Sequence, residues 1–191
     1  MAGIGVGRTA KGPSLIAAAL HPRTLVAWGF LTWLFAVPAW ATPPPSLLIL
    51  PLDWVDTSGE TSSHAKEHAD RLAALGEYLS RLLAKTGLYA IVDPTPIAAD
   101  IEHARATQSL DACNGCERDL ARLVHADRVL VGEIDKVSTL IGYLRLNIID
   151  VGGGRIVFAR VLSFRGDTDT AWENAIQFFV RDLTAAQPER H

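Results

Sequence analysis

The stretch RVLVGEIDKVSTLIGYLRLNIIDVGGGRIVFARVLSFR, residues 128–165, decides the fold of this chain. It predicts three strands, at residues 128–137, 143–151 and 155–165, because β-branched and aromatic side chains dominate each of them. The glycines at residues 152–154 supply the positive φ that a reversal between the last two strands needs. In the middle strand, apolar and polar side chains alternate. We therefore predict an antiparallel meander with one face toward solvent.

Upstream of the meander, residues 46–52 (SLLILPL) form an apolar run without polar alternation, as expected of a central strand covered on both faces. A polar loop is expected at residues 53–63. Residues 64–85 predict the clearest helix, because leucines recur on one stripe and charged residues lie outside it. Residues 88–92 predict a second short strand, and residues 97–109 predict an alanine-rich helix.

The remaining elements complete a sheet covered by helices. A further helix follows Cys116, and Trp172, Ile176, Phe179 and Leu183 recur at helical spacing along a terminal helix. The predicted order is β-α-β-α-α-β-β-β-α, which is typical of the α+β class. We predict one domain at residues 47–185, with a mixed sheet of about five strands that ends in the meander and has helices packed on it.

The amino-terminal segment predicts export. Residues 25–37 (LVAWGFLTWLFAV) are an uncharged apolar run, shorter than the about 20 residues that span a membrane, and basic residues precede it. Ala39-Trp40-Ala41 fits the small-x-small cleavage rule. We predict a signal peptide at residues 1–41, a proline-rich exit segment at residues 42–46 and a disordered tail at residues 186–191. The alternative is an uncleaved anchor that begins near Ser14.

These features place the protein in the periplasm, exported and soluble after the leader is removed, with no stable membrane insertion. Of the 18 lysines and arginines, three precede residue 42, while all 21 acidic residues follow it. The exported chain therefore carries 15 basic against 21 acidic residues, a formal net charge of −6. Nucleic acids and anionic lipid surfaces need a basic patch, so this balance argues against both as the main partner.

Cys113 and Cys116, in the sequence Cys-Asn-Gly-Cys, are the chain's two cysteines. In an oxidising compartment such a pair is most often a disulfide. Thiol-disulfide exchange and metal binding stay open as alternatives, because a thiolate on Cys116 would lie at a helix amino-terminus. Asn114 is expected to cap that helix, with Glu117 completing a capping box. Glu117 also stands where covalent haem attachment needs a histidine.

No catalytic residue and no cofactor is predicted. Residues 64–68 (HAKEH) match the pattern of inverted zinc proteases, in which two histidines share a helical face. The match is five residues long in a chain with six histidines, so His64 and His68 are weak candidates for a metal site and no resident metal is expected. Spacing alone singles out no Ser-His-Asp arrangement.

Five segments resemble a family of secreted proteobacterial proteins of unknown function: residues 113–117, 126–132, 136–138 and 165–172, with Asp56-Thr57-Ser58. The resemblance covers most of residues 47–183. Members of that family often lie beside genes for periplasmic quinoprotein alcohol dehydrogenases and their cytochromes. His125 stands where the family pattern has glycine, and histidine tolerates the left-handed conformation expected there.

The order of elements is also similar to the amino-terminal domain of TolB and to the CsgG-like and LpoB-like envelope modules. This similarity implies a protein-binding domain, although fold does not fix function. We therefore expect a non-enzymatic periplasmic accessory protein that binds an envelope partner, such as a dehydrogenase or cytochrome, through a sheet edge or through loops near residues 53–63 and 166–170. The interaction candidates are Asp53, Asp56, Thr57, Ser58, Arg165, Asp167, Asp169 and Trp172. The alternative is a thiol-disulfide or metal-handling protein that uses the cysteine pair, and a small-molecule sensor or carrier is a third hypothesis.

Overall fold

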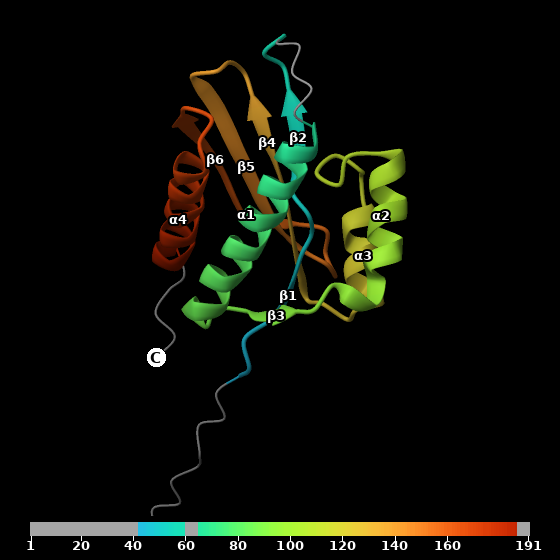
Figure 1. Ribbon diagram of the computed structural model, residues 1–191. Helices are drawn as coiled ribbons and strands as arrows, with labels where there is room; N and C mark the ends of the chain where they lie inside the picture. The colour runs from blue at the N-terminus through green and yellow to red at the C-terminus, as the bar shows by residue number, and fades with distance from the viewer. Residues whose placement is uncertain (1–41, 60–64, 187–191) are drawn as a thin grey trace, which may run out of the picture. The chain divides into compact units, whose positions relative to one another are not determined.

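A mixed sheet with helices on both faces makes up the computed structural model, which describes residues 42–59 and 65–186 (Figure 1). The chain divides into two units, Met1–Trp40 and Ala41–His191, and every described residue belongs to the second. That unit is one α+β domain, as predicted. The predicted signal peptide at residues 1–41 lies outside the described residues, and so does the predicted tail except Ala186, which ends the last helix.

The elements follow the predicted order with one additional strand. The strands are β1 (Ser46–Ile49), β2 (Asp53–Asp56), β3 (Ala90–Val92), β4 (Arg128–Lys136), β5 (Ile141–Asp150) and β6 (Ile156–Arg165). The helices are α1 (Ala65–Thr86), α2 (Ala98–Thr107), α3 (Cys116–Leu123) and α4 (Asp169–Ala186), with a 3₁₀ turn at Thr95–Ile97. Within the described part of the chain, no helix is both long and apolar enough to cross a membrane.

The sheet has the strand order β3-β1-β4-β5-β6. Strand β2 follows β1 along the same edge of β4, where β1 pairs with residues 128–130 and β2 with residues 133–136. Strands β1 and β2 both run parallel to β4, and β3 runs parallel to β1. The antiparallel pairs β4–β5 and β5–β6 confirm the predicted meander. The apolar run at residues 46–52 contains the predicted central strand, because β1 lies between β3 and β4.

The prediction of a polar loop at residues 53–63 was wrong for its first four residues, which form β2. Pro51 interrupts the strand because it has no backbone N–H to donate, and the chain then rejoins β4 two residues later. Asp53 and Asp56 concealed this strand, since aspartate is depleted in strands. The sheet therefore has six strands where we predicted about five.

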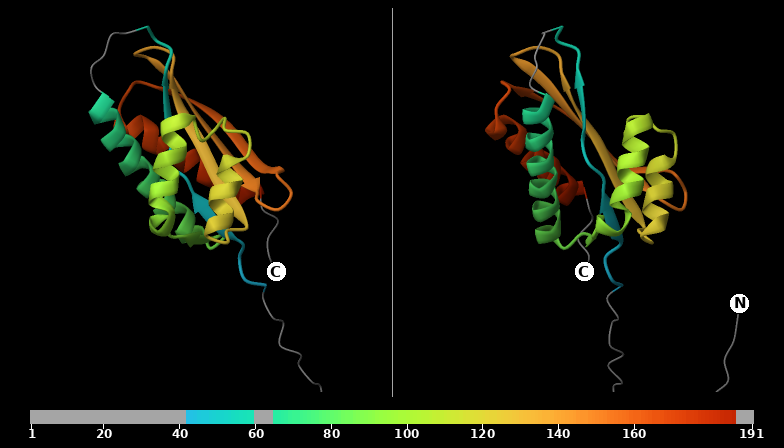
Figure 2. Two further views of the ribbon diagram at one scale, coloured as in Figure 1. Left: turned by 90° about the vertical axis from the view of Figure 1, so that its right-hand side faces the viewer. Right: turned by 45° about the vertical axis from the view of Figure 1, so that its right-hand side comes forward.

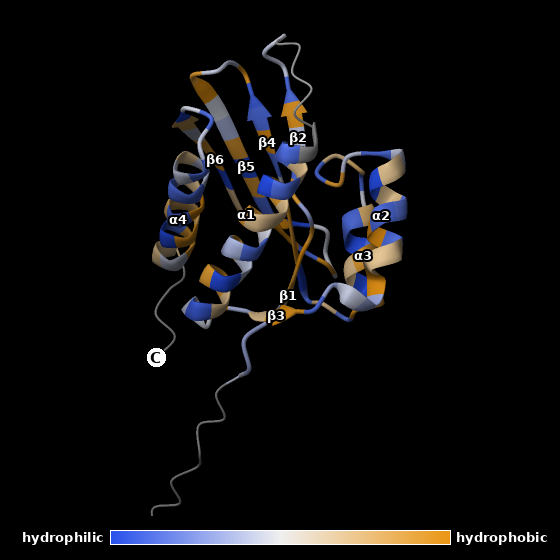
Figure 3. Ribbon diagram, in the orientation of Figure 1, coloured by the Kyte–Doolittle hydropathy of each residue, from blue (hydrophilic) through white to orange (hydrophobic). Residues whose placement is uncertain are grey.

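Two hydrophobic clusters fill the space between the sheet and its helices. Figure 2 shows α1 and α4 on one face of the sheet and α2 and α3 on the other. The larger cluster packs α1 and α4 on the sheet, and its buried side chains include Leu79, Leu146, Trp172 and Phe179. The smaller cluster packs α2 and α3 on Val129 and its neighbours. Strands and helices both carry hydrophobic and hydrophilic colour in Figure 3, as expected of elements that are buried on one side.

The two edges of the sheet differ in length. On one side, β3 has three residues and is followed by Asp93-Pro94, which ends the pairing. On the other side, β6 has ten residues, and in the described part of the chain no strand pairs with its outer edge. Ile156 and Val161 on β6 are 53% and 59% exposed. The exposed charges of Arg160 and Arg165 on the same strand are its protection against pairing with other chains.

Candidate functional site

One side of β2 is open. Its other side pairs with β4, and among the described residues no strand lies beyond it, because β3 pairs with β1 alone. The Thr57 N–H donates to the Lys136 carbonyl at 2.9 Å, so alternation along the strand turns the backbone groups of Trp54 and Asp56 away from β4. The free edge of β2 therefore offers two N–H and two C=O groups in strand geometry.

This edge forms the floor of a groove of about 1560 Å³, which we call the β2 groove. Residues 49–56 line its floor, and α1 and α2 form its two walls. The α1 wall includes Ala69, Ala73 and Gly76, which are spaced so that they share one helical face. The two wall helices lie on opposite sides of the sheet edge, as the right-hand view of Figure 2 shows. An extended chain in the groove would lie in the plane of the sheet.

The α2 wall depends on few contacts. Ile101 is the one buried residue of that helix. The loop after α2 is fastened to β2 instead: the Ser109 hydroxyl donates to Asp53 Oδ2 at 2.6 Å, and the Asp111 N–H donates to the same oxygen at 3.2 Å. Asp53, an interaction candidate from the sequence, thus ties the second wall of the groove to its floor.

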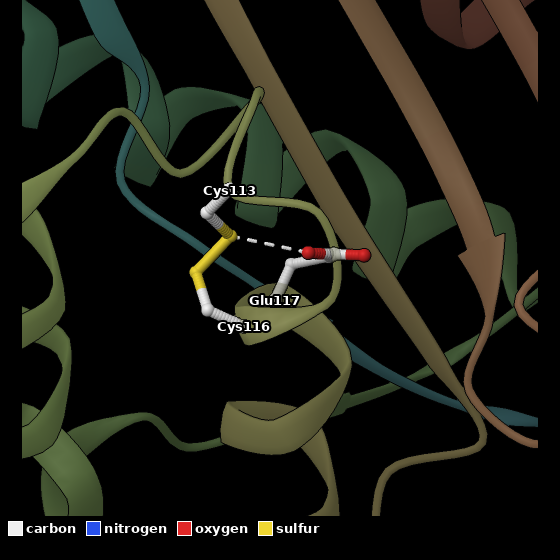
Figure 4. A group of neighbouring side chains, drawn as sticks. All are labelled: Cys113, Cys116 and Glu117. Carbon is white, nitrogen blue, oxygen red and sulfur yellow. Dashed lines mark hydrogen bonds between the residues drawn. A yellow bond between two sulfur atoms is a disulfide. The ribbon is translucent and has the colours of Figure 1, made fainter.

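The predicted disulfide is present between Cys113 and Cys116 at the end of that loop (Figure 4). Glu117, which is 8% exposed, lies with Oε2 3.1 Å from Cys113 Sγ and accepts the Gly115 N–H at 2.9 Å. The expected cap was wrong, because the residue that caps α3 is Gly115, with φ of 122°, and not Asn114. Asn114 adopts the left-handed conformation instead.

The position of Glu117 bears on the two chemical alternatives. A carboxylate beside Cys113 disfavours a negative thiolate there, and the thiolate carries out disulfide exchange, whereas for a metal ion the carboxylate would itself be a ligand. Cys113, Cys116 and Glu117 make up the one cluster of three potential metal ligands within residues 42–59 and 65–186, and the disulfide engages both sulfurs. The geometry therefore favours a structural disulfide that fixes the start of α3.

Three of the interaction candidates meet behind the floor of the groove. Arg71 on α1 donates from Nε to Asp169 at 2.7 Å and from Nη1 to Asp167 at 3.0 Å. Its guanidinium also lies 4.0 Å from the centre of the Trp172 ring. Trp172 is 1% exposed, so it supports the site from within the core rather than from the surface.

The same cluster reaches the groove through β2. Trp54 stacks on His68 with ring centres 4.3 Å apart, and both residues line the β2 groove. The sequence singled out His68 only as a metal candidate and missed Trp54 and Arg71, for which no local pattern gives a signal. His64, the other metal candidate, lies outside the described residues.

Of the remaining interaction candidates, Asp56, Thr57 and Ser58 lie at the end of β2, Asp53 begins that strand and Arg165 ends β6. Ser58 donates to Asp56 from both its N–H and its hydroxyl, and these bonds, aided by Lys136, lower the pKa of Asp56. Thr57 Oγ1 donates to Asp135 at 3.0 Å. Arg165 ends β6 as an exposed residue opposite Ile141. Of these residues, Asp53 and Asp56 line the groove, at the start and at the end of β2.

Carboxylates concentrate on the α2 side of the groove floor. Asp111 and Glu133 both lie near Arg145, at 3.6 Å and 2.6 Å from its Nη1. Burial raises the pKa of Asp111 and of Glu133, and the charge of Asp53 raises both further, against the opposing effect of Arg145. Asp111 and Glu133 therefore share one arginine behind the groove, and of these three carboxylates Asp53 is the one that lines it.

Comparison with sequence families gives one result. The DUF3280 family model, described as "Protein of unknown function (DUF2380)", matches residues 45–183. The match spans the whole sheet, both walls of the β2 groove and the disulfide. A search of the curated proteins finds no match.

Solved structures with a similar arrangement include three bacterial proteins. The LpoB C-terminal domain from Salmonella enterica is 16% identical, with 65% of this chain and 85% of that chain covered and a TM-score of 0.41. The PelC dodecamer from Paraburkholderia phytofirmans is 12% identical, with 77% and 92% covered and a TM-score of 0.47. TolB from Acinetobacter baumannii is 11% identical, with 76% and 29% covered and a TM-score of 0.43. Likeness at this level does not support an inference about function.

Proposed function

Because the chain belongs to the DUF3280 family, which is described as of unknown function, we propose a role from the geometry of the β2 groove. The protein is a non-enzymatic interaction module that binds an extended segment of a partner protein along the free edge of β2. The observation that carries this proposal is an open strand edge at the bottom of a walled groove. Strand addition at such an edge is a common mode of peptide recognition, in which main-chain hydrogen bonds supply affinity.

The walls strengthen this proposal. An exposed strand edge pairs indiscriminately unless something limits access to it. Here α1 and α2 flank the edge, so an added strand must present side chains that fit both walls. Backbone bonds to Trp54 and Asp56 would align the segment, and the walls would select its sequence. The arrangement can therefore provide specificity as well as affinity.

The setting of this function is also a proposal. The leader-like amino-terminal sequence supports export to the periplasm, with no stable membrane insertion after cleavage. The partner would then be an envelope protein, and the family resemblance described above points to a periplasmic dehydrogenase or cytochrome. Mass spectrometry of the exported chain tests this setting, since it reports the amino-terminus and the state of both sulfurs in one measurement.

Photo-crosslinking tests the groove directly. A benzoylphenylalanine at Ala73, which lines the groove, should give an adduct with one envelope protein, whereas the same group at exposed Ala74 on the neighbouring face of α1 should not. The adducted protein is then purified and its affinity for the intact chain is measured. Equal adducts at both positions would contradict docking in the groove.

A pair of variants at Asp56 then tests the backbone contribution. Asp56→Ala and Asp56→Pro both remove the carboxylate, but only proline removes the N–H on the free edge. Val55 already has the extended conformation that a following proline requires. We expect Asp56→Pro to bind the partner about tenfold more weakly than Asp56→Ala, as one lost hydrogen bond implies. Equal affinities would exclude strand addition at this edge.

A further inference from the structure

Gly76 lies in the middle of α1, where glycine is unfavourable. Glycine in a helix interior costs about 0.5–1 kcal/mol relative to alanine. A packing reason for it would be a neighbouring group that leaves no room for a side chain. A Cβ added at Gly76 would meet no atom of the described residues within 4 Å. The protein's own packing therefore does not require glycine at this position.

The location of Gly76 in the β2 groove suggests a reason for glycine at this position. Gly76 lines the β2 groove on the same face of α1 as Ala69, Ala73 and Ser80. No side chain on this face extends past its first heavy atoms, so the groove reaches nearly to the helix backbone. We propose that the partner's extended segment passes closest to α1 at Gly76, and that this segment is basic. The inference rests on the proposed function and specifies the chemistry of the partner.

The charges around the groove supply the second part of the proposal. On the two rims, Glu77 pairs with Arg81 at 3.6 Å, and Glu102 pairs with Arg105 at 3.1 Å. Each pair lies within one helix, so the rims are close to neutral. The floor of the groove carries negative charge, because Asp53 and Asp56 line it. Of the two, Asp56 has the Lys136 ammonium nearby, at 3.7 Å.

The surroundings of Asp53 extend this negative region. Asp111 and Glu133 lie behind it on the α2 side, with Arg145 as their shared cation. A lysine or arginine on the α2-facing side of the added strand would meet the Asp53 carboxylate, with Asp111 and Glu133 largely buried behind it, whereas an acidic residue would be repelled. Residues that face α1 would have to be small or apolar, because Ala69, Ala73 and Gly76 occupy the middle of that wall, beside Leu72. The segment should therefore alternate apolar and basic side chains.

A display experiment tests both parts. A random heptapeptide library on phage is selected on the intact exported chain, and the recovered peptides are measured on three variants. Gly76→Trp fills the groove, Gly76→Ala adds a single methyl group, and Ala74→Trp places the same bulk outside the groove as a control. Thermal unfolding of each variant is recorded in parallel, so that loss of binding is not confused with loss of the fold.

We expect stability and binding to change in opposite directions. Gly76→Ala should raise the unfolding temperature and weaken peptide binding about threefold or more, since a methyl group occupies space that the segment needs. Gly76→Trp should abolish binding, while Ala74→Trp should bind like the wild type. The selected peptides should be extended and basic, and their affinity should fall as salt is added.

Three results would overturn the inference in distinguishable ways. Selected peptides that are acidic would refute the proposed chemistry. Peptides that tolerate Gly76→Trp but are lost in Asp56→Pro would refute the close approach at Gly76 and leave the proposed function standing. Failure to enrich any peptide over selection on the Gly76→Trp variant would count against both proposals.

Discussion

The two helical layers of this protein are held to one sheet in different ways. Helices α1 and α4 have 22 and 18 residues and share a large cluster of fully buried leucine and aromatic side chains. Helices α2 and α3 have ten and eight residues, and they depend on a smaller cluster, a disulfide and hydrogen bonds to Asp53. The β2 groove lies between the layers, so one of its walls belongs to the large cluster and the other to the small one.

The largest expected effect is the loss of stability when a cavity is made in one or the other helical layer. Leu79 on α1 is fully buried, and Leu79→Ala should lower the free energy of unfolding by about 2–5 kcal/mol. Ile101→Ala in α2 should cost less, because the thin layer around it can collapse into the space. Urea denaturation measures both. If the Ile101 variant lost as much stability as the Leu79 variant, the two layers would be equally important for the fold.

Removal of the disulfide should be the next largest effect. Loop-entropy estimates for the short ring between Cys113 and Cys116 give about 2 kcal/mol. We expect the double replacement by serine to speed amide hydrogen exchange in α2 and α3 while α1 and α4 keep their protection. Hydrogen exchange with mass spectrometry measures the amide exchange of both layers in one sample. Uniform loss of protection would show that the layers unfold as one unit.

Glu117 should slow the reaction of the reduced cysteines with an alkylating reagent. Glu117→Gln keeps an acceptor for the Gly115 N–H but removes the charge beside Cys113. The reduced variant should therefore react with iodoacetamide about threefold to tenfold faster at neutral pH, because its thiolate is less disfavoured. A Glu117→Asp variant, which keeps the charge, is the control. A rate unchanged by Glu117→Gln would reopen redox exchange as a role for the pair.

The smallest expected effect is the change in the free energy of unfolding as the pH falls. Bonds from Ser46 lower the pKa of Asp127, so its contribution is present above the ordinary carboxyl value and is lost as the pH falls through the lowered value. Burial raises the pKa of Glu133, whose contribution is instead present at low pH and is lost as the pH rises through the raised value.

Two variants separate these opposing contributions. Asp127→Asn should lose stability mainly near neutral pH, whereas Glu133→Gln, which resembles the protonated side chain, should change stability little in acid and raise it near neutral pH. Unfolding free energies measured from about pH 7 down to about pH 3 test the signs. Parallel curves for the two variants would contradict the assignment.

Elements with a clear period were predictable from sequence. The meander and the terminal helix have strong alternation or helical spacing, and Trp172, Ile176, Phe179 and Leu183 are all buried as predicted. The expected left-handed backbone at His125 is confirmed by its φ of 54°. These features are local, so a single stretch of chain contains the information that determines them.

The candidate site was predictable only in part, because it is assembled from distant segments. Strand β2 has two aspartates among its four residues, and pairing with β4 makes it a strand. The link from Arg71 to Asp167 and Asp169 joins residues far apart in the chain, and no spacing rule connects them. The groove itself requires the relative placement of α1 and α2. Asn114 misled the capping prediction because Gly115 tolerates the required positive φ more easily.

The long outer edge of β6 has a practical consequence for anyone who prepares this protein. In the described part of the chain no strand pairs with this outer edge, which has ten residues without a proline and can template intermolecular pairing when two molecules collide. Concentrated stocks and high-level expression raise the frequency of such collisions. Val161 is the most exposed of the large apolar residues of β6, so Val161→Lys is the first substitution to make when a monodisperse sample is needed.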